Sequence, residues 1–232
     1  MARKKSFAVI GANNFGIAVA KTLEDKKQSV VVFDFDEHRL NSHLAAMPGV
    51  VGIVLDATNK TSMEKAGIKQ FDGIIVAFGS NMEVSIITVL NLLDLGIENI
   101  MAKAKDLRHK RILLALGLDE NQVIIPDIIS GKMVATRSMF DIDIDVQSVD
   151  DDFISTTMIV SDPGVIDKSI QESRLTANKE WNIIQIKRNG KVILPDEKTI
   201  LKKDDQIVLF AKITAINDLI LKIQGDESLF EN

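Results

Sequence analysis

The loop Gly11-Ala12-Asn13-Asn14-Phe15-Gly16 is the first segment of the chain whose residue types and spacing suit a chemical task. It follows an apolar run at residues 7–10 and opens a stretch with helical periodicity. A helix that begins in such a loop presents free N–H groups that can bind a diphosphate. Asp34 ends the next apolar run, 18 residues after Gly16, where a carboxylate can accept hydrogen bonds from ribose hydroxyls. The spacing therefore indicates a nucleotide-binding site.

The loop departs from the G-x-G-x-x-G pattern at its second glycine, which is Asn13 here. Asparagine tolerates left-handed backbone angles, so the turn can survive the change. The asparagine Cβ would nevertheless crowd a phosphate. A loop that serves only as the turn between a strand and a helix is therefore the alternative interpretation.

The elements that must position this loop alternate between short apolar runs and amphipathic segments over the first 125 residues. Strands that are apolar on both faces and alternate with helices are typical of a parallel sheet that is covered on both sides. We therefore expect a doubly wound α/β domain of the Rossmann type. The expected strands are residues 7–10, 30–33, 50–55, 74–78, 100–104 and 123–125, and the expected helices are residues 15–26, 37–45, 60–66, 82–95 and 107–116.

A smaller α+β domain is predicted to follow, after one more helix at residues 126–140. Residues 141–146 alternate between acidic and apolar types, which is typical of a half-exposed strand. Asn189-Gly190 is a strong signal for a hairpin. The expected domains are residues 1–140 and 141–232. Further strands are expected at residues 160–165, 182–186, 191–194 and 206–212, with a closing helix at residues 214–223.

The composition argues against several classes of function. A net charge of −5 and a pI near 5.3 do not suit a nucleic-acid binder, which needs a basic face. The 232-residue chain has no cysteine, which removes disulfides, thiolate metal sites and cysteine nucleophiles and suits a cytoplasmic location. No run approaches the roughly 18–20 apolar residues that cross a bilayer. His38, His43 and His109 have no metal-ligand spacing, and we expect them at the surface.

An NAD-dependent oxidoreductase is the main enzymatic alternative, and it needs a proton donor near the hydride site. The chain has no tyrosine, which rules out a Tyr-x-x-x-Lys catalytic pair, and the second domain offers no evident acid–base cluster. Walker, H-E-x-x-H and G-x-S-x-G motifs are also absent from the sequence. We therefore expect a binding protein rather than an enzyme.

Short motifs in both halves of the chain occur in an order that one known family shares. They are Phe7-Ala8-Val9-Ile10-Gly11 with Phe15-Gly16, Val32-Phe33-Asp34, Leu55-Asp56-Ala57-Thr58, Val76-Ala77-Phe78-Gly79-Ser80-Asn81, Ala102-Lys103-Ala104, Ile125-Pro126-Asp127, residues 182–189, and Pro195 with Thr199-Ile200-Leu201 and Asp204-Asp205. Together they resemble the regulator-of-potassium-conductance (RCK) proteins of the KtrA/TrkA type. The resemblance covers nearly the whole chain and implies an RCK N-terminal domain followed by an RCK C-terminal domain.

The resemblance implies an adenine nucleotide, ATP or ADP, across the carboxyl ends of the first four strands. Asp34 would hold the ribose, and Lys103 would lie near the phosphates. Asp127 matches an acidic residue that reaches across a dimer toward the γ-phosphate and a bound cation, so it is also the implied metal ligand. The implied nucleotide-binding residues are Gly11, Asn13, Asn14, Phe15, Gly16, Asp34, Asp56, Ala57, Thr58, Ala77, Phe78, Gly79, Asn81, Lys103 and Asp127.

Two loop positions leave the identity of the nucleotide open. KtrA-like relatives carry glycine at the position of Asn13 and arginine at the position of Asn14. An arginine fork binds phosphate through paired charge-assisted hydrogen bonds, which asparagine cannot reproduce. ATP, ADP, AMP, NAD(H) and the absence of any nucleotide are therefore all open.

Simpler structural roles are also open for several of these residues. Asp56 is a suitable helix cap, and so is Ser80 or Asn81 for the helix expected from Met82. Lys103 suits a solvated strand end, and Asp127 suits the first turn of a helix, where its charge complements the helix dipole. Each of these roles can coexist with ligand binding.

The resemblance also implies assembly and a membrane partner. The family forms homodimers that build an octameric ring, and the ring gates a separate potassium-translocating membrane subunit from the cytoplasmic, inner face of the cell membrane. Regulation of another cation transporter or antiporter is the alternative. The helix expected at residues 82–95 is apolar around most of its circumference, so we expect another subunit to cover part of it, with ordinary core burial as the alternative.

A second ligand is implied for the C-terminal domain. In some KtrA relatives this domain binds cyclic di-AMP at the dimer interface, between apolar side chains and a few polar groups. The residues of the matching region are Ile166, Ile170, Arg174, Ile183, Ile184 and Pro195. Packing of a dimer core is the alternative role for Ile170 and Arg174.

Overall fold

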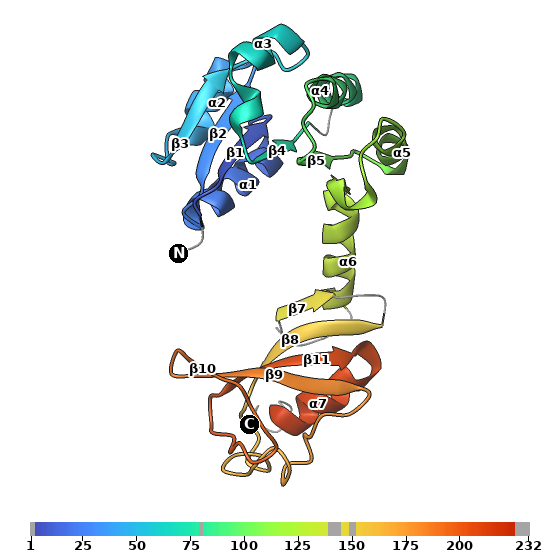
Figure 1. Ribbon diagram of the computed structural model, residues 1–232. Helices are drawn as coiled ribbons and strands as arrows, with labels where there is room; N and C mark the ends of the chain where they lie inside the picture. The colour runs from blue at the N-terminus through green and yellow to red at the C-terminus, as the bar shows by residue number, and fades with distance from the viewer. Residues whose placement is uncertain (1–2, 79–80, 139–144, 149–151, 226–232) are drawn as a thin grey trace. The chain divides into compact units, whose positions relative to one another are not determined.

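The computed structural model describes residues 3–78, 81–138, 145–148 and 152–225. The chain divides into two compact units, Met1–Asp127 and Ile128–Asn232, and Figure 1 shows the elements of each. This division lies near the start of helix α6 (Pro126–Ser138). The domain boundary expected after residue 140 stays a prediction.

The first unit is built on a parallel sheet of six strands in the order β3-β2-β1-β4-β5-β6. Helices alternate with these strands along the chain, so the predicted doubly wound α/β fold is confirmed. The elements are β1 (Ser6–Ile10), α1 (Asn14–Asp25), β2 (Ser29–Asp34), α2 (Glu37–Leu44), β3 (Val50–Val54), α3 (Lys60–Lys65), β4 (Gly73–Val76), α4 (Met82–Asp94), β5 (Ile100–Lys103), α5 (Leu107–Ala115) and β6 (Val123–Ile124), with 3-10 turns at Ile68–Gln70 and Glu120–Gln122.

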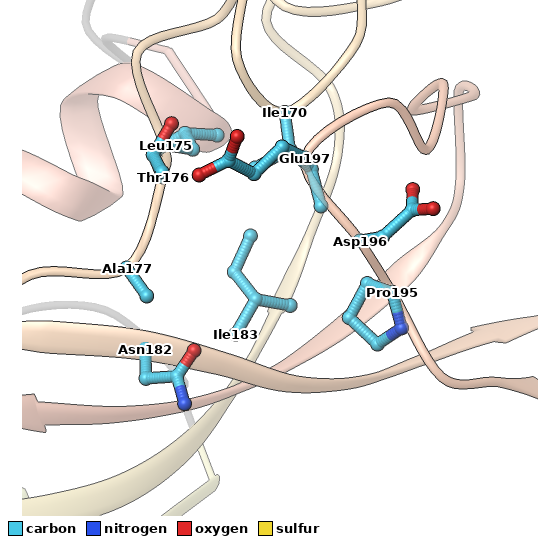
Figure 2. Close-up of a pocket in the computed structure, with 9 residues that line it drawn as sticks. All are labelled: Ile170, Leu175, Thr176, Ala177, Asn182, Ile183, Pro195, Asp196 and Glu197. Atoms are coloured by element: carbon cyan, nitrogen blue, oxygen red, sulfur yellow. The ribbon is translucent and has the colours of Figure 1, made fainter.

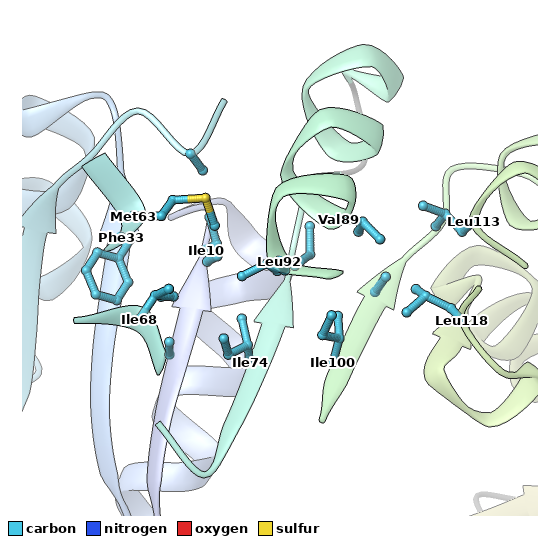
Figure 3. Close-up of a cluster of buried hydrophobic side chains, with 14 of the residues drawn as sticks. Ile10, Phe33, Met63, Ile68, Ile74, Val89, Leu92, Ile100, Leu113 and Leu118 are labelled. Atoms are coloured by element: carbon cyan, nitrogen blue, oxygen red, sulfur yellow. The ribbon is translucent and has the colours of Figure 1, made fainter. Parts of the chain in front are cut away.

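Both faces of the sheet are buried at its central strands, because alternate residues of such a strand enter different cores. In β1, Ala8 and Ile10 pack with side chains of α3, α4 and α5, whereas Val9 packs with side chains of α1 and α2. Figure 3 shows the first of these cores, where Ile10 and Leu92 lie between the sheet and the helices. Full burial of such a side chain contributes about 1.5–3 kcal/mol. The sheet is therefore a rigid base for the loops at its edges.

The edge where the site is expected lies at the carboxyl ends of the strands. Strand order reverses at β1, since the chain continues to β2 and β3 on one side and to β4, β5 and β6 on the other. In open α/β sheets, ligands bind beside such a reversal, outside the carboxyl ends of the strands. The loops that leave β1, β2, β3 and β4 all begin at this edge (Figure 1).

Helix α4 buries one face and exposes another. Thr88, Val89 and Leu92 are buried, whereas Leu90 is 45% exposed. Some of the apolar residues around this helix are therefore buried in the core of the first unit. The coverage of the exposed part by another subunit stays a prediction.

The second unit contains an antiparallel sheet of five strands in the order β10-β9-β11-β8-β7. Asn189 and Gly190 have φ angles of 49° and 75°, and a type I′ turn requires positive φ at both positions. The predicted hairpin is confirmed. The elements are β7 (Asp145–Ser148), β8 (Phe153–Ile159), β9 (Trp181–Arg188), β10 (Lys191–Ile193), β11 (Gln206–Lys212), a 3-10 turn at Ile213–Ala215, and α7 (Ile216–Ile223).

The strand predicted at residues 160–165 is wrong. The strand in this region is β8, and Pro163-Gly164 lies in a turn after it. Ile154, Thr156 and Met158 are the buried positions of β8. A threonine at a core position, flanked by Ser155 and Thr157, obscures the alternation of apolar and polar residues. The β-branched side chains were nevertheless a usable strand signal.

The segment that joins the two units is described in part. The helix predicted at residues 126–140 is described as far as Ser138. The strand predicted at residues 141–146 lies outside the described residues except for its last two, which begin β7.

An ion pair between a half-buried arginine and a buried aspartate joins β9 to the residue before β11 in the second unit. The Arg188 guanidinium donates through Nε and one terminal nitrogen to the two carboxylate oxygens of Asp205, both at 2.7 Å. Asp205 is 1% exposed and also accepts from the backbone N–H of Lys202 at 2.8 Å. These hydrogen bonds to Asp205 raise the pKa of Arg188 above its usual value. The two-point geometry fixes both side chains.

Candidate nucleotide site

The loop after β1 depends on both of its glycines. Gly11 has a φ of +112°, a conformation that side chains rarely permit, and its N–H donates to the carbonyl oxygen of Phe33 at 2.7 Å. A Cβ on Gly16 would collide with the carbonyl oxygen of Gly11. The two glycines let the first turn of α1 lie directly on the end of β1.

Asn13 is the N-cap of α1. Its Oδ1 accepts from the N–H groups of Phe15 and Gly16, both at 3.1 Å, and its Nδ2 donates to the carbonyl oxygen of Ala77 at 2.8 Å. The backbone is extended there, with φ of −91° and ψ of 176°, so no left-handed angle is needed. The loop is formed at this position by side-chain capping, where the G-x-G-x-x-G pattern has glycine.

Asp34 is buried, and both of its carboxylate oxygens already have partners. One oxygen accepts from the N–H of Ala12 at 2.7 Å and lies 3.5 Å from the Arg39 guanidinium, while the other accepts from the N–H of Asp36 at 3.0 Å. Asp34 is 1% exposed. In this geometry Asp34 supports the loop, and its predicted contact with a ribose stays a prediction.

A cavity of about 520 Å³ opens at the carboxyl ends of the strands, within the range of roughly 300–1,000 Å³ that small-molecule sites occupy. The segments after β1, β2, β3 and β4 contribute to it, as expected for a site at the strand reversal. The lining combines apolar surface with a few amide, hydroxyl and charged groups. Its residues are Asn13, Phe35, Arg39, Leu55, Asp56, Ala57, Thr58, Phe78, Asn81 and Val84.

Six of the residues implied by the family resemblance meet in this cavity, namely Asn13, Asp56, Ala57, Thr58, Phe78 and Asn81. The carboxylate of Asp56 accepts from the N–H of Thr58 at 2.9 Å and from its hydroxyl at 2.6 Å. It does not cap α3, whose N-cap is Asn59. Asn81 does cap α4, accepting from the N–H of Val84 at 3.2 Å. The cap role expected for Asn81 is confirmed, and the one expected for Asp56 is wrong.

The remaining implied residues lie outside the described cavity lining. Gly11, Gly16 and Ala77 are buried beneath the loop, and Asn14 is exposed in the first turn of α1. The ammonium of Lys103 lies 5.3 Å from the ring centre of Phe15, as in a cation–π contact. Asp127 lies in the first turn of α6, and Gly79 lies outside the described residues. The nucleotide-binding roles of all these residues stay predictions.

Phe35 and Arg39 line the cavity and were missed in the sequence. Phe35 follows β2 directly and is 64% exposed, and the Arg39 guanidinium lies 5.6 Å from the centre of its ring. Arg39 also lies 3.7 Å from the carboxylate of Asp36. An aromatic residue just past the carboxyl end of a parallel strand was a usable signal. The pair offers a flat apolar and cationic surface suited to a heterocyclic base.

His109 is buried, so the surface position expected for it is wrong. It is 0% exposed in α5, and its Nδ1 accepts from the N–H of Lys105 at 3.1 Å. Burial lowers the pKa of His109; the charge of Lys105 lowers it further, and the charge of Asp106 opposes both effects. The histidine is therefore a core residue whose surroundings favour its neutral form.

The second unit has its own smaller cavity, of about 150 Å³, which Figure 2 shows between the start of β9 and two loops. Ile170, Ile183 and Pro195 of the expected second-ligand residues line it together. Ile184 points away, being 46% exposed on the opposite face of β9, and Ile166 packs at the edge of the core. The other lining residues are Leu175, Thr176, Ala177, Asn182, Asp196 and Glu197.

Arg174 adopts a positive φ of 53°, and its carbonyl oxygen accepts from the ammonium of Lys222 at 2.8 Å. It is not among the described residues that line the cavity of the second unit. At about 150 Å³, this cavity is smaller than the roughly 300 Å³ at which small-ligand sites begin. This cavity alone therefore falls short of the volume expected for a cyclic dinucleotide site.

The fold and the position of the cavity define a Rossmann-type nucleotide-binding module joined to a small α+β domain. The chain belongs to the TrkA-N domain family, whose profile matches residues 7–126, and the TrkA-C domain profile matches residues 157–224. This confirms the resemblance to the RCK proteins.

Curated relatives match the chain over most of its length. The Ktr system potassium uptake protein C of Bacillus subtilis is 29% identical over 216 residues, which cover 92% of this chain and 95% of that protein. The uncharacterised protein MG323 of Mycoplasma genitalium is 31% identical over 192 residues, covering 83% and 82% of the two chains. The chain is thus homologous to Ktr-type potassium uptake proteins.

Among solved structures, the GsuK channel shares the fold with a TM-score of 0.59 at 17% identity. The match covers 96% of this chain but 40% of that one, so the chain spans less than half the length of that channel protein. Within the described part of the chain, no helix is both long and apolar enough to span a bilayer. No group of three or more potential metal ligands gathers among the same residues.

Proposed function

We propose that this chain is the nucleotide-binding regulatory subunit of a potassium uptake system. The proposal rests on one combined observation. The chain matches Ktr proteins over both of its domains, and its first unit has a cavity at the point where the strand order reverses. The Ktr system potassium uptake protein A of Bacillus subtilis, 28% identical over 91% of its length, supports the same assignment.

Nucleotide binding is supported by the cavity and by relatives of the same fold. One solved structure is a GsuK channel bound to NAD, with a TM-score of 0.54, and another is the Kef C-terminal domain of Shewanella denitrificans in an AMP-bound form, with a TM-score of 0.50. In this chain, Phe35, Leu55 and Phe78 would cover the faces of a base. Asp56, Thr58 and Asn81 would offer polar contacts. We infer that the ligand is bound and released unchanged.

The regulatory step is a change in assembly geometry. Two copies of the chain would pair, and the pairs would form an octameric ring on the cytoplasmic face of the membrane, attached through the potassium-translocating subunit. Asp127 would contact the ligand or a cation across the pair. A ligand can shift the ring only by binding one of its shapes more tightly than the other.

The second unit would sense a second ligand. The cavity that Ile170, Ile183 and Pro195 line together with polar residues would be half of a site that a two-fold axis completes, and a cyclic dinucleotide such as cyclic di-AMP has matching two-fold symmetry. Ile166, Arg174 and Ile184 are close in the sequence to residues that line this cavity.

Ligand binding is tested by thermal unfolding of the full chain with ATP, ADP, AMP, NAD, NADH and cyclic di-AMP. A ligand at about 100 times its Kd adds about 2.7 kcal/mol to stability. Phe35→Ala removes an exposed cavity side chain, and Leu107→Ala is its matched control, since both side chains are 64% exposed. We expect the first variant, but not the second, to weaken the response to a nucleotide. Equal responses in wild type and Phe35→Ala contradict this binding site.

The partner is tested by potassium uptake in a bacterial strain that lacks its own uptake systems. The chain is expressed with a Ktr-type membrane subunit in one arm and with a cation/proton antiporter in another. Nucleotide-dependent uptake in the first arm supports the proposal. A response confined to the antiporter arm would show that the partner is an antiporter and not a potassium-translocating subunit. No response in either arm would refute the regulatory role.

A further inference from the structure

Two N–H donors of the loop that would bind a diphosphate are already occupied. The N–H groups of Phe15 and Gly16 lie in the first turn of α1, where a bound phosphate would receive them. Both donate instead to Oδ1 of Asn13 at 3.1 Å. Each N–H carries one proton, so a phosphate oxygen at this place must displace the asparagine side chain.

The asparagine side chain is also held from its other end. Its Nδ2 donates to the carbonyl oxygen of Ala77 at 2.8 Å, which joins the loop after β1 to the end of β4. Asn13 is half-buried. Rotation of the side chain toward solvent would break three hydrogen bonds together and leave the buried carbonyl of Ala77 without this partner. The side chain is therefore a fixed part of the cavity wall.

The charges around the cavity do not favour a polyphosphate either. Of the described lining residues, Arg39 is the cation and Asp56 the anion, so the lining carries no net charge. The Arg39 guanidinium already lies 3.5 Å from Asp34 and 3.7 Å from Asp36. The Lys103 ammonium lies over the Phe15 ring, outside the described lining.

We propose that this cavity binds a nucleoside or nucleoside monophosphate, and that the Asn13 side chain takes the place of the diphosphate in the loop. The proposal rests on the function proposed above and narrows its ligand class. The base and ribose contact the apolar and amide lining, and the di- or triphosphate extension adds no affinity. The site therefore does not distinguish ADP from ATP through its phosphate loop.

The test is isothermal titration of the full chain with adenosine, AMP, ADP and ATP, in wild type and in Asn13→Gly. Glycine is an acceptable N-cap and frees the two N–H groups, while the Ala77 carbonyl loses the Asn13 donor. Asn59→Gly is the matched control, because Asn59 caps α3 in the same way and is not among the described cavity residues.

We expect wild-type affinities for the four ligands to agree within about threefold. Asn13→Gly should raise the affinity for ADP and ATP by about tenfold or more, because phosphate then accepts from two helix N-terminal donors, while the affinity for adenosine stays nearly constant. Asn59→Gly should change none of them. A gain of function of this kind does not arise from a damaged fold.

Two results would overturn the proposal. In the first, wild type binds ADP or ATP at least tenfold more tightly than adenosine. In the second, the ratio of the ADP or ATP affinity to the adenosine affinity is the same in Asn13→Gly as in wild type. Failure of the proposed nucleotide-sensing function would give a different result. If wild type binds none of the four ligands while Asn13→Gly binds ADP, the occupied loop is upheld and nucleotide sensing is refuted. If neither protein binds any ligand, both proposals are wrong.

Discussion

Replacement of Asp34 by alanine separates a structural role for this residue from a ligand-binding one. The carboxylate is 1% exposed and accepts from the N–H groups of Ala12 and Asp36 at 2.7 and 3.0 Å. Ala12 is itself fully buried. Alanine at position 34 would leave the Ala12 N–H in the core without this acceptor and would release the start of the α1 loop.

The size of the effect follows from these contacts. A hydrogen bond to a charged group contributes about 1.5–3 kcal/mol, and a buried donor left unsatisfied costs about 1–3 kcal/mol. Two such bonds, one of them to a fully buried N–H, give an expected loss of about 3–5 kcal/mol from the free energy of unfolding of the first unit. That is a large part of the roughly 5–15 kcal/mol that stabilises a typical domain. Asp34→Asn keeps one acceptor and should lose about 2 kcal/mol.

The assay is urea unfolding of the full chain followed by two signals. Trp181 is the one tryptophan of the sequence and lies in β9, so its fluorescence reports on the second unit. Circular dichroism at helix wavelengths reports on both units. We expect Asp34→Ala to lower the midpoint of the first unit and to leave the Trp181 transition in place. Asp56→Ala is the control, since that carboxylate is exposed and bonds only to its own turn.

A stability loss below about 1 kcal/mol in Asp34→Ala would refute the structural role, because one charged hydrogen bond alone exceeds that value. If nucleotide binding disappeared in the same variant, the carboxylate would instead face a ribose, as the family resemblance implies. The structural role therefore predicts a large loss of stability, whereas the ribose-binding role predicts a small loss of stability together with loss of nucleotide binding.

Three further predictions follow from single side chains. Gly16→Ala should destabilise the first unit by about 2 kcal/mol or more, measured by urea unfolding, because its Cβ collides with the loop carbonyl. His109→Gln should flatten the pH dependence of stability as pH falls below 6.5, because the lowered pKa of the buried imidazole gives stability that is present above the unfolded-state value and lost as pH falls through the folded-state value; an unchanged slope would contradict this. Asp205→Asn should lower the stability of the second unit by about 2–4 kcal/mol, seen in the tryptophan transition, because Arg188 loses its charged partner.

The fold could be predicted from the sequence because its signals are repeated. Strands such as β1 and β2 are apolar on both faces, and one missed residue does not change a pattern that recurs six times. The β8 strand was misplaced because its signal is not repeated. Thr156 occupies a core position, and the strand has few apolar residues that would still show the alternation. Parallel sheets are therefore easier to read than half-polar antiparallel ones.

Single side chains were harder to place, because local composition does not fix which face of a helix is buried. His109 lies among Arg108, Lys110 and Arg111, which indicates a solvated segment. It also stands four residues before the buried Leu113, on the same face of α5. That i,i+4 relation was the better guide, and it outweighs the charge of the neighbours because one face of the helix must pack on the sheet.

Asn13 shows why a motif departure has to be read by its own chemistry and not only by its bulk. The sequence indicates a Cβ that crowds a phosphate, yet the structure gives the decisive role to the amide, which satisfies the same donors that a phosphate would use. The preference of asparagine for N-caps was known from the residue type alone. What the sequence could not supply was the Ala77 carbonyl, 64 residues away, that fixes the amide in place. A glycine leaves these two N–H groups free for a ligand, whereas an asparagine anchored at both ends satisfies them itself, so the loop shape is kept and we expect its affinity for phosphate to be lower.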